Sequence, residues 1–171
     1  MTLNDRQQIL FEDYTGFIIP NTYKKTFIGH ENNIKCVAFA GRKGTKIISG
    51  SRVWNTQTAQ CLGDLEGHTS RIWDISTNQS GILLASASTD GTTKLWDLEK
   101  MICTATLTEN GNDIYSVNFH SSENYIVNAG YDKTIQLYDI STGLSIKTIS
   151  SYLGEISSVD ISSDVLPINI F

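Results

Sequence analysis

The chain has 171 residues, 40% of them hydrophobic, and a formal net charge of −5, which is ordinary for a soluble globular domain. The negative balance argues against a nucleic-acid or anionic-membrane partner, because both attract clustered Lys and Arg. The N-terminus lacks a basic start followed by an apolar run, and no stretch approaches the ~18 consecutive apolar residues of a membrane span. A cytoplasmic or nuclear location is therefore expected.

Cysteine usage excludes two further classes of protein. Cys36, Cys61 and Cys103 are the three cysteines, and no two of them form a CxxC pair. An odd, sparse count argues against a disulfide framework, and the missing pair argues against a structural zinc site. We expect neither a metal nor a cofactor.

A period of 42 residues runs through most of the chain. Trp54, Trp96 and Tyr138 stand 42 residues apart, and the run from Asp90 to Asp97 recurs from Asp132 to Asp139. Independent columns that share one period indicate tandem copies of a single supersecondary unit.

Short strands are the elements expected in each copy. The first strand is expected at 34–39, 72–77 and 114–119. Apolar residues with a three-residue step and then a two-residue step fall at 34, 37 and 39, at 114, 117 and 119, and at 156, 159 and 161. That spacing predicts a strand with one β-bulge before simple alternation. In the second copy, further strands are expected at 82–88, before a tight turn at Asp90-Gly91, then up to Trp96, and at 101–107.

The two ends of the repeat region are incomplete. Residues 23–28 are predicted to be the last strand of a preceding copy, and residues 156–161 the first strand of a following one. After Ser163 the pattern stops, and segment 1–22 shows no repeat. These limits suggest an N-terminal extension over 1–22 and a repeat domain over 23–171.

Four strands per ~42 residues form one blade of a β-propeller. Gly29-His30 and Gly67-His68, followed by Trp54-Asn55 and Trp96-Asp97, resemble the Gly-His to Trp-Asp signature of the WD-repeat (beta-transducin-like) family. The resemblance implies an all-β, partial WD-repeat β-propeller with about three to four four-stranded antiparallel blades and an unclosed ring. The repeats would span about 29–66, 67–108 and 109–150, with the start of another at 151–171.

The resemblance also implies a hydrogen-bonded network in each blade. Its members are a His before the first strand, a Ser or Thr in the second, the turn Asp and the Trp. Only the second repeat has all four, namely His68, Ser86, Asp90 and Trp96. Each buried polar group in such a set can satisfy another, and Asp90 is expected to favour the charged form of His68.

A catalytic His–Ser–Asp triad is the alternative interpretation of these residues. The spacing is that of a blade network, Ser86 lies in mid-strand rather than on a strained elbow, and no oxyanion-hole loop is visible. We therefore assign no catalytic residue and do not expect an enzyme.

The other repeats depart from the pattern. The remaining network residues assigned by the resemblance are His30, Ser49, Trp54, Asp132 and Tyr138. In the third repeat Asn110 replaces the His and Tyr138 the Trp, which weakens the network. In the first, about five residues are missing between Ser49 and Trp54, including the turn Asp, so no full-length hairpin can form there.

Members of the family commonly bind peptides on the narrow face around the central channel. The positions of this rim that the resemblance assigns to a partner are Lys35, Arg71, Trp73, Asp113, Tyr115, Tyr131 and Ser157. Two aromatic rings and two cations on one rim resemble a binding hot spot in composition. The alternative is that Trp73 and Tyr115 only pack over the edge of the core.

The function implied is that of a non-catalytic scaffold or adaptor that binds other proteins or peptides within a larger complex. One alternative is a regulatory substrate-receptor subunit of an enzyme complex, for example a ubiquitin ligase or a chromatin or RNA-processing complex. Another is a truncated product with little function. Self-association that completes the propeller is a further expectation, because an unclosed arc leaves strand edges exposed.

Overall fold

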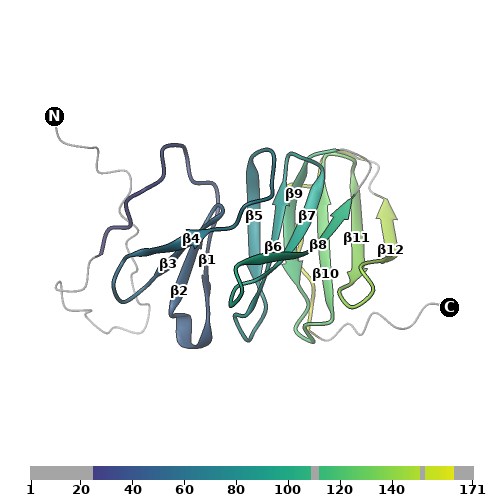
Figure 1. Cartoon of the computed structure of the whole chain (residues 1–171). Helices are drawn as coiled ribbons and strands as arrows, with labels where there is room; N and C mark the ends of the chain where they lie inside the picture. The colour runs from purple at the N-terminus through teal and green to yellow at the C-terminus, as the bar shows by residue number, and fades with distance from the viewer. Residues whose placement is uncertain (1–24, 109–111, 151–152, 164–171) are drawn as a thin grey trace, which may run out of the picture.

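The computed structural model describes residues 25–108, 112–150 and 153–163, which form an open arc of three antiparallel sheets, one after another along the chain (Figure 1). Each sheet is one propeller blade with four strands in chain order. Blade 1 consists of β1 (Val37–Ala40), β2 (Lys46–Ser49), β3 (Arg52–Asn55) and β4 (Cys61–Asp64), with a short 3-10 turn, η3 (Arg42–Gly44), between β1 and β2. Blade 2 consists of β5 (Ile72–Thr77), β6 (Leu83–Ser88), β7 (Thr92–Asp97) and β8 (Ile102–Thr108). Blade 3 consists of β9 (Ile114–Phe119), β10 (Tyr125–Gly130), β11 (Thr134–Asp139) and β12 (Ser145–Ser150).

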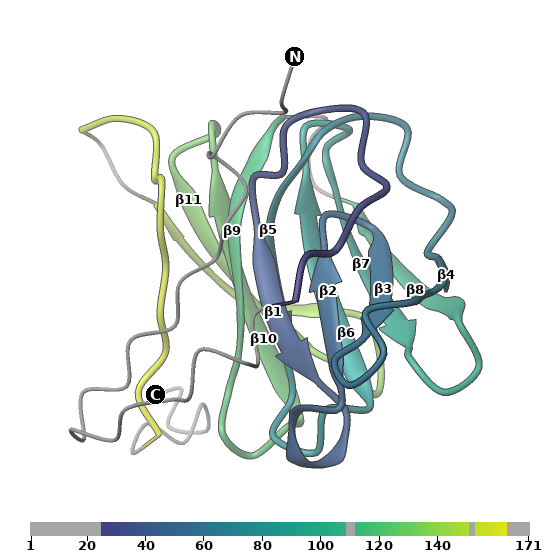
Figure 2. The same ribbon diagram turned by 90° about the vertical axis from the view of Figure 1, so that its left-hand side faces the viewer.

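The first strands of the three blades lie side by side, with β5 between β1 and β9 (Figure 2). The β5–β6 ladder shifts register between Ile72 and Asp74, and the β9–β10 ladder shifts where Gly130 pairs with Ile114. The predicted β-bulge is therefore confirmed in the first strands of blades 2 and 3, and the β1–β2 ladder has no register shift. It places Trp73 and Tyr115 at the bulges, at the start of their strands.

The hydrophobic core lies between the blades rather than inside each one. One cluster joins Ile48 and Val53 of blade 1 to Leu84 and Trp96 of blade 2. A second joins blades 2 and 3 and includes Leu95, Leu107, Ile114, Val117 and Ile126. A single sheet can bury a face only against another layer, so each blade depends on its neighbour for stability.

The hairpin of blade 1 is short, as the missing residues predict. Ser49 pairs with Arg52, so Gly50 and Ser51 alone connect β2 to β3. Gly50 has a φ of 58°, and a two-residue hairpin turn favours glycine at such a position. Because β2 ends at Ser49, residues 34–36 have no ladder partner, and β1 begins at Val37 instead of the predicted residue 34.

Two further predicted strands are not formed. Residues 25–28 carry no strand, and residues 23 and 24 lie outside the described part. Residues 156–161 are also not a strand, although the Ile156 N–H donates to the Gly130 carbonyl at 3.0 Å and the Val159 N–H to Ser116 Oγ at 3.2 Å. A ladder needs a neighbouring strand on which to extend, and none of the described residues supplies one for this segment.

The described residues contain no helix of a length and hydropathy that would allow it to cross a bilayer.

Candidate protein-interaction surface

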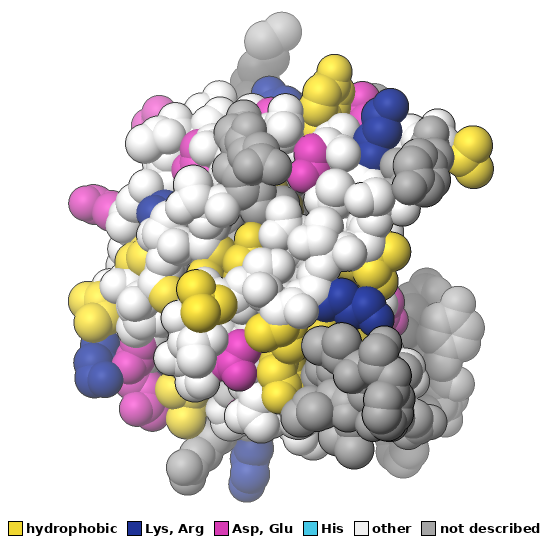
Figure 3. Space-filling model, turned by 90° about the vertical axis from the view of Figure 1, so that its right-hand side faces the viewer, with side chains coloured by type: hydrophobic (Ala, Val, Ile, Leu, Met, Phe, Trp, Pro, Cys, Tyr) yellow, Lys and Arg dark blue, Asp and Glu magenta, His cyan; other side chains and the backbone are white. Residues whose placement is uncertain are grey.

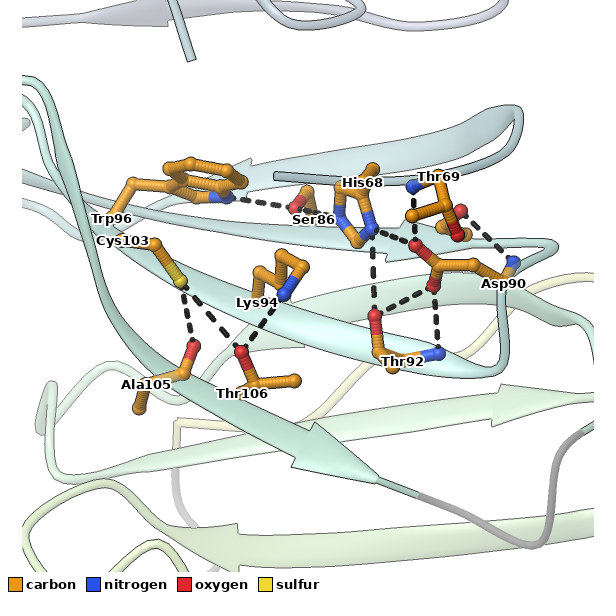
Figure 4. A network of polar contacts seen from close by, with 11 residues as sticks. His68, Thr69, Ser86, Asp90, Thr92, Lys94, Trp96, Cys103, Ala105 and Thr106 are labelled. Carbon is orange, nitrogen blue, oxygen red and sulfur yellow. Dashed lines mark hydrogen bonds and ion pairs between the residues drawn. The ribbon is translucent and has the colours of Figure 1, made fainter. Parts of the chain in front are cut away.

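Blade 2 brings the four signature side chains into one hydrogen-bonded chain (Figure 4). The Trp96 indole N–H donates to Ser86 Oγ at 2.8 Å, and Ser86 Oγ lies 2.7 Å from His68 Nε2. His68 Nδ1 in turn lies 2.7 Å from Asp90 Oδ2. Since Trp96 and Ser86 are each 1% exposed, this network satisfies polar groups that water cannot reach.

Two threonines complete the network around Asp90, and sequence reasoning did not include them. The Thr69 backbone N–H donates to Asp90 Oδ2 at 3.0 Å, and the Thr92 hydroxyl donates to Oδ1 at 2.6 Å. Both lie within two residues of a signature residue, which is the signal that could have found them. Burial alone would raise the pKa of Asp90, but the hydrogen bonds from Thr92, His68 and Thr69 outweigh it and lower the pKa to about 2.

Asp90 raises the pKa of His68, as predicted, but the net shift of that pKa is downward. Burial lowers the pKa of His68 below its ordinary value, and this effect exceeds the opposing influence of the Asp90 carboxylate. Burial removes the water that would stabilise an imidazolium, so His68 is neutral at pH 7.

The networks of the other two blades differ from that of blade 2. In blade 1 the His30–Ser49–Trp54 chain is present, with His30 Nε2 2.6 Å from Ser49 Oγ and the Trp54 indole N–H donating to the same oxygen at 2.7 Å. In blade 3 the Asp132 carboxylate accepts two hydrogen bonds from Thr134 within its own turn. Tyr138 donates to Gln136 at 3.0 Å, and Asn110 lies outside the described residues.

Acidification should destabilise the fold through the two network histidines. Burial lowers the pKa of both His68 and His30 from the ordinary value of 6.5. Below pH 6.5 the unfolded chain therefore binds protons that the folded chain does not, and the free energy of unfolding falls as the pH falls through the folded-state pKa values. Urea-denaturation midpoints at pH 7.5 and pH 5.5 measure this effect. We expect a lower midpoint at pH 5.5 and a smaller difference in His68→Gln; an unchanged or higher midpoint at pH 5.5 would contradict the assignment.

The Ser86 hydroxyl cannot act as a catalytic nucleophile in this arrangement. It is 1% exposed and lies between the Trp96 indole and the His68 ring. A nucleophile must reach a substrate carbonyl beside an oxyanion site, and Ser86 has no such access. Among the described residues, no group of three or more His, Cys, Asp or Glu side chains could hold a metal ion.

The rim forms a compact cluster of aromatic rings and cations. The Trp73 and Tyr115 rings pack edge to face with centroids 5.7 Å apart. The Arg71 guanidinium lies 5.0 Å from the Trp73 ring centroid, and the Lys35 ammonium 5.8 Å from it. Lys35 and Arg71 are exposed, while both rings are half-buried. Edge-to-face packing and cation–π contacts hold these side chains in place.

Acidic groups lie near Tyr115. Burial raises the pKa of Tyr115, and the nearby Glu155 and Asp113 carboxylates raise it further. Tyr131 is 52% exposed, and its backbone N–H donates to the Asp113 carbonyl at 2.9 Å. Ser157 is exposed, and no contact joins it to the aromatic pair within the described residues. We use the term rim cluster for Lys35, Arg71, Trp73 and Tyr115.

Two further contacts fix the orientation of the rim. The Trp73 indole N–H donates to Thr89 Oγ1 at 2.8 Å, which holds the ring across the β5–β6 edge. The next residue, Asp74, accepts hydrogen bonds from Ser116 Oγ at 2.9 Å and from the Val117 N–H at 3.1 Å. Sequence reasoning missed Asp74. Its distance of 42 residues from Ser116, one repeat along the chain, is the signal that could have found this bond between blades.

Comparison with known proteins places these features in one family. A family model described as "WD domain, G-beta repeat" matches residues 21–55, 59–97 and 101–139. "Nuclear distribution protein PAC1" of Arthroderma otae is 30% identical over 89 residues, which cover 44% of this chain and 19% of that protein. "Eukaryotic translation initiation factor 3 subunit I" of Debaryomyces hansenii is 37% identical over 73 residues, covering 40% of this chain and 21% of that protein.

Solved structures show the same fold at low sequence identity. The "Crystal structure of RRP9 WD40 repeats" superposes with a TM-score of 0.72 and 15% identity, over 77% of this chain and 43% of that one. The chain spans about a fifth of the length of the curated relatives named above. The family model covers more than half of the chain, and its matches contain the Trp columns of all three blades. The chain therefore belongs to the WD-repeat family of β-propeller proteins.

Proposed function

We propose that this chain is a non-catalytic adaptor that binds a segment of another protein through the rim cluster. The observation that carries the proposal is the contact between Trp73 and Tyr115, with the Arg71 and Lys35 cations over the Trp73 ring. Trp, Tyr and Arg are enriched among residues that dominate binding energy at interfaces. Their preset geometry reduces the entropy lost on binding.

The charges of the rim favour an extended segment with a defined direction. Lys35 and Arg71 form no ion pair with any described residue. The Asp113 and Glu155 carboxylates act on Tyr115, whereas the two cations lie against Trp73. A bound segment would place an acidic residue at Lys35 and Arg71 and a basic one near Asp113 and Glu155, because complementary charges set register.

Relatives support a role as a subunit of an assembly. One similar protein is itself named as a subunit of a translation initiation factor. We infer that this chain likewise works inside a complex, in the cytoplasm or the nucleus. A regulatory subunit that positions a substrate for an enzyme would use the same rim cluster.

Peptide selection tests the proposal directly. A phage-displayed random peptide library is selected on the purified chain, and the affinity of the recovered peptide is measured by calorimetry. We expect Trp73→Ala and Tyr115→Ala to weaken binding by at least about tenfold, which corresponds to ~1.4 kcal/mol. Ile102→Ala, at a half-exposed position of the outer strand β8, serves as the control and should bind normally. Equal affinity of the wild type and both aromatic variants would exclude the rim cluster as the binding site.

A second surface for a protein partner lies at the end of the arc formed by blade 3. Figure 3 shows this end, where hydrophobic side chains, in yellow, reach the surface among polar ones. In and beside β12, Leu144, Ile149 and Leu153 are 65%, 51% and 100% exposed. Exposed apolar groups beside a strand edge favour pairing with another blade. We propose that this end packs against a further blade, supplied by a second copy of the chain or by another chain.

A further inference from the structure

A polar cleft of about 380 Å³ lies between blades 1 and 2, beside the shortened hairpin. The side chains that matter for its chemistry are His30, Ser51, Arg52, Asp64, Glu66 and His68. The cleft is separate from the rim cluster, none of whose residues lines it.

Blades 1 and 2 have nearly identical geometry around their histidines. The His30 and Trp54 ring centroids are 5.9 Å apart at 57°, and those of His68 and Trp96 are 6.0 Å apart at 58°. Both histidines bond a strand serine through Nε2, and both are followed by a two-residue bend. Because the two environments match, the group that contacts His68 indicates the kind of group that can bind beside His30.

In blade 2 this environment holds a carboxylate. Asp90 Oδ2 lies 2.7 Å from His68 Nδ1 and accepts from the Thr69 backbone N–H at 3.0 Å. In blade 1 the two-residue turn supplies no aspartate. Among the described residues, no hydrogen bond is made to His30 Nδ1 or to the Glu31 backbone N–H.

A partner carboxylate would meet His30 at Nδ1. The Trp54 indole N–H donates to Ser49 Oγ, and Ser49 Oγ lies 2.6 Å from His30 Nε2. Burial, followed by the charge of Arg52, lowers the pKa of His30, which favours the neutral ring with a single proton. In the tautomer in which the Ser49 hydroxyl donates to Nε2, that proton is on Nδ1, and Nδ1 and the Glu31 N–H are both donors for a partner.

The charges around the cleft are compatible with an added carboxylate. Arg52 occupies the position that Lys94 has in blade 2. The charge of Arg52 lowers the pKa of His30, as the charge of Lys94 lowers the pKa of His68. Arg52 donates to Asp64 at 2.6 and 2.9 Å and to the Gly29 carbonyl at 2.5 Å, so the Asp64 charge is balanced. Glu66 and Glu31 are exposed, where water screens their repulsion.

We propose that this cleft binds the carboxylate side chain of an Asp or Glu from a partner protein, in the position that Asp90 fills in blade 2. The carboxylate would accept from His30 Nδ1 and the Glu31 N–H. Hydrogen bonds to a charged acceptor are stronger than neutral ones. A partner that docks here would supply the carboxylate that the blade 1 network lacks.

The test compares two short peptides by NMR of the histidine rings. The probes are acetyl-Thr-Asp-Gly-Thr-amide, which copies the blade 2 turn, and its Asn counterpart. We expect a saturable shift of the His30 Cε1–H signal with the Asp peptide, no such shift with the Asn peptide, and a smaller shift of the His68 signal than of the His30 signal, because Asp90 already occupies the carboxylate position at His68. No response of His30 to the Asp peptide, or an equal response to both peptides, would overturn the proposal.

An insertion variant gives an independent test of the same site. Inserting Thr-Asp-Gly-Thr-Thr between Ser51 and Arg52 restores the spacing of blade 2, with Thr-Ala-Gly-Thr-Thr as the matched control. We expect the Asp insertion to abolish the peptide response and to raise the melting temperature above that of the Ala insertion. Equal melting temperatures of the two insertions would contradict a carboxylate position at His30. Peptide binding at the rim cluster should be unchanged in both, so failure here is distinct from failure of the rim proposal.

Discussion

Replacing Trp96 by alanine is expected to lower the free energy of unfolding by about 3–5 kcal/mol, the range for truncation of a buried large aromatic residue. Trp96 is 1% exposed and packs in the cluster that joins blades 1 and 2. Its loss leaves a cavity and removes the hydrogen bond to Ser86 Oγ, so that a buried hydroxyl loses one of its partners. Chemical denaturation followed by circular dichroism measures the change.

Trp73→Ala is the matched control for Trp96→Ala. Trp73 is half-buried on the rim and donates to Thr89 rather than to the interior network. We expect its replacement to cost about 1 kcal/mol of stability or less, the usual range away from the core, while it weakens partner binding. If both variants lose the same free energy of unfolding, Trp73 contributes to the core as much as Trp96 does. That result would contradict the assignment of Trp73 to the rim and of Trp96 to the interior network.

Gly130→Ala should cost about 3 kcal/mol, at the upper end of the range for overpacking. A Cβ at Gly130 would stand 2.0 Å from the Asp113 carbonyl oxygen and 2.9 Å from Ile114 Cα, both of which are main-chain atoms. β10 cannot move away from β9 to make room for the Cβ without breaking hydrogen bonds of the bulged β9–β10 ladder. A thermal melt measures the loss.

The obstruction at Gly130 lies in the backbone, which gives a specific control. Asp113→Ala removes the neighbouring carboxylate but leaves the carbonyl oxygen in place, so it should not rescue Gly130→Ala. A melting temperature close to that of the wild type in Gly130→Ala would show that the two strands are further apart than the structure has them.

The fold could be predicted largely because its signal is repeated. A tryptophan or tyrosine every 42 residues and two Gly-His pairs identify blades even where one copy is defective. The short hairpin was also predictable, because the missing residues fall between Ser49 and Trp54, where both flanking columns are intact. The ends of strands could be predicted less well. β1 begins three residues later than predicted because its ladder partner, β2, ends at Ser49.

The hydrogen-bonded network of blade 2 could be predicted from the family resemblance but not from the chemistry of its residues alone. The contacts of the network join His68, in the loop before β5, to Ser86, Asp90 and Trp96 of the β6–β7 hairpin, and only the fold brings these two segments together. The effect of Asp90 on the pKa of His68 could be predicted, because Asp90 is visible in the pattern. The burial that outweighs it could not, because it depends on tertiary packing. The bonds from Asp74 to blade 3 are likewise a product of packing between blades.

The indole N–H signals of the three tryptophans offer the most direct test of the central claim. Trp54 and Trp96 donate to buried serines, and Trp73 alone lies on the rim. A nitrogen-15 correlation spectrum recorded during titration with a peptide selected on the chain separates the three signals. If the rim cluster binds the partner, the Trp73 signal moves with the binding curve while those of Trp54 and Trp96 stay in place. A saturating peptide that leaves the Trp73 signal unmoved would contradict the claim that this WD-repeat arc recognises its partner through the rim.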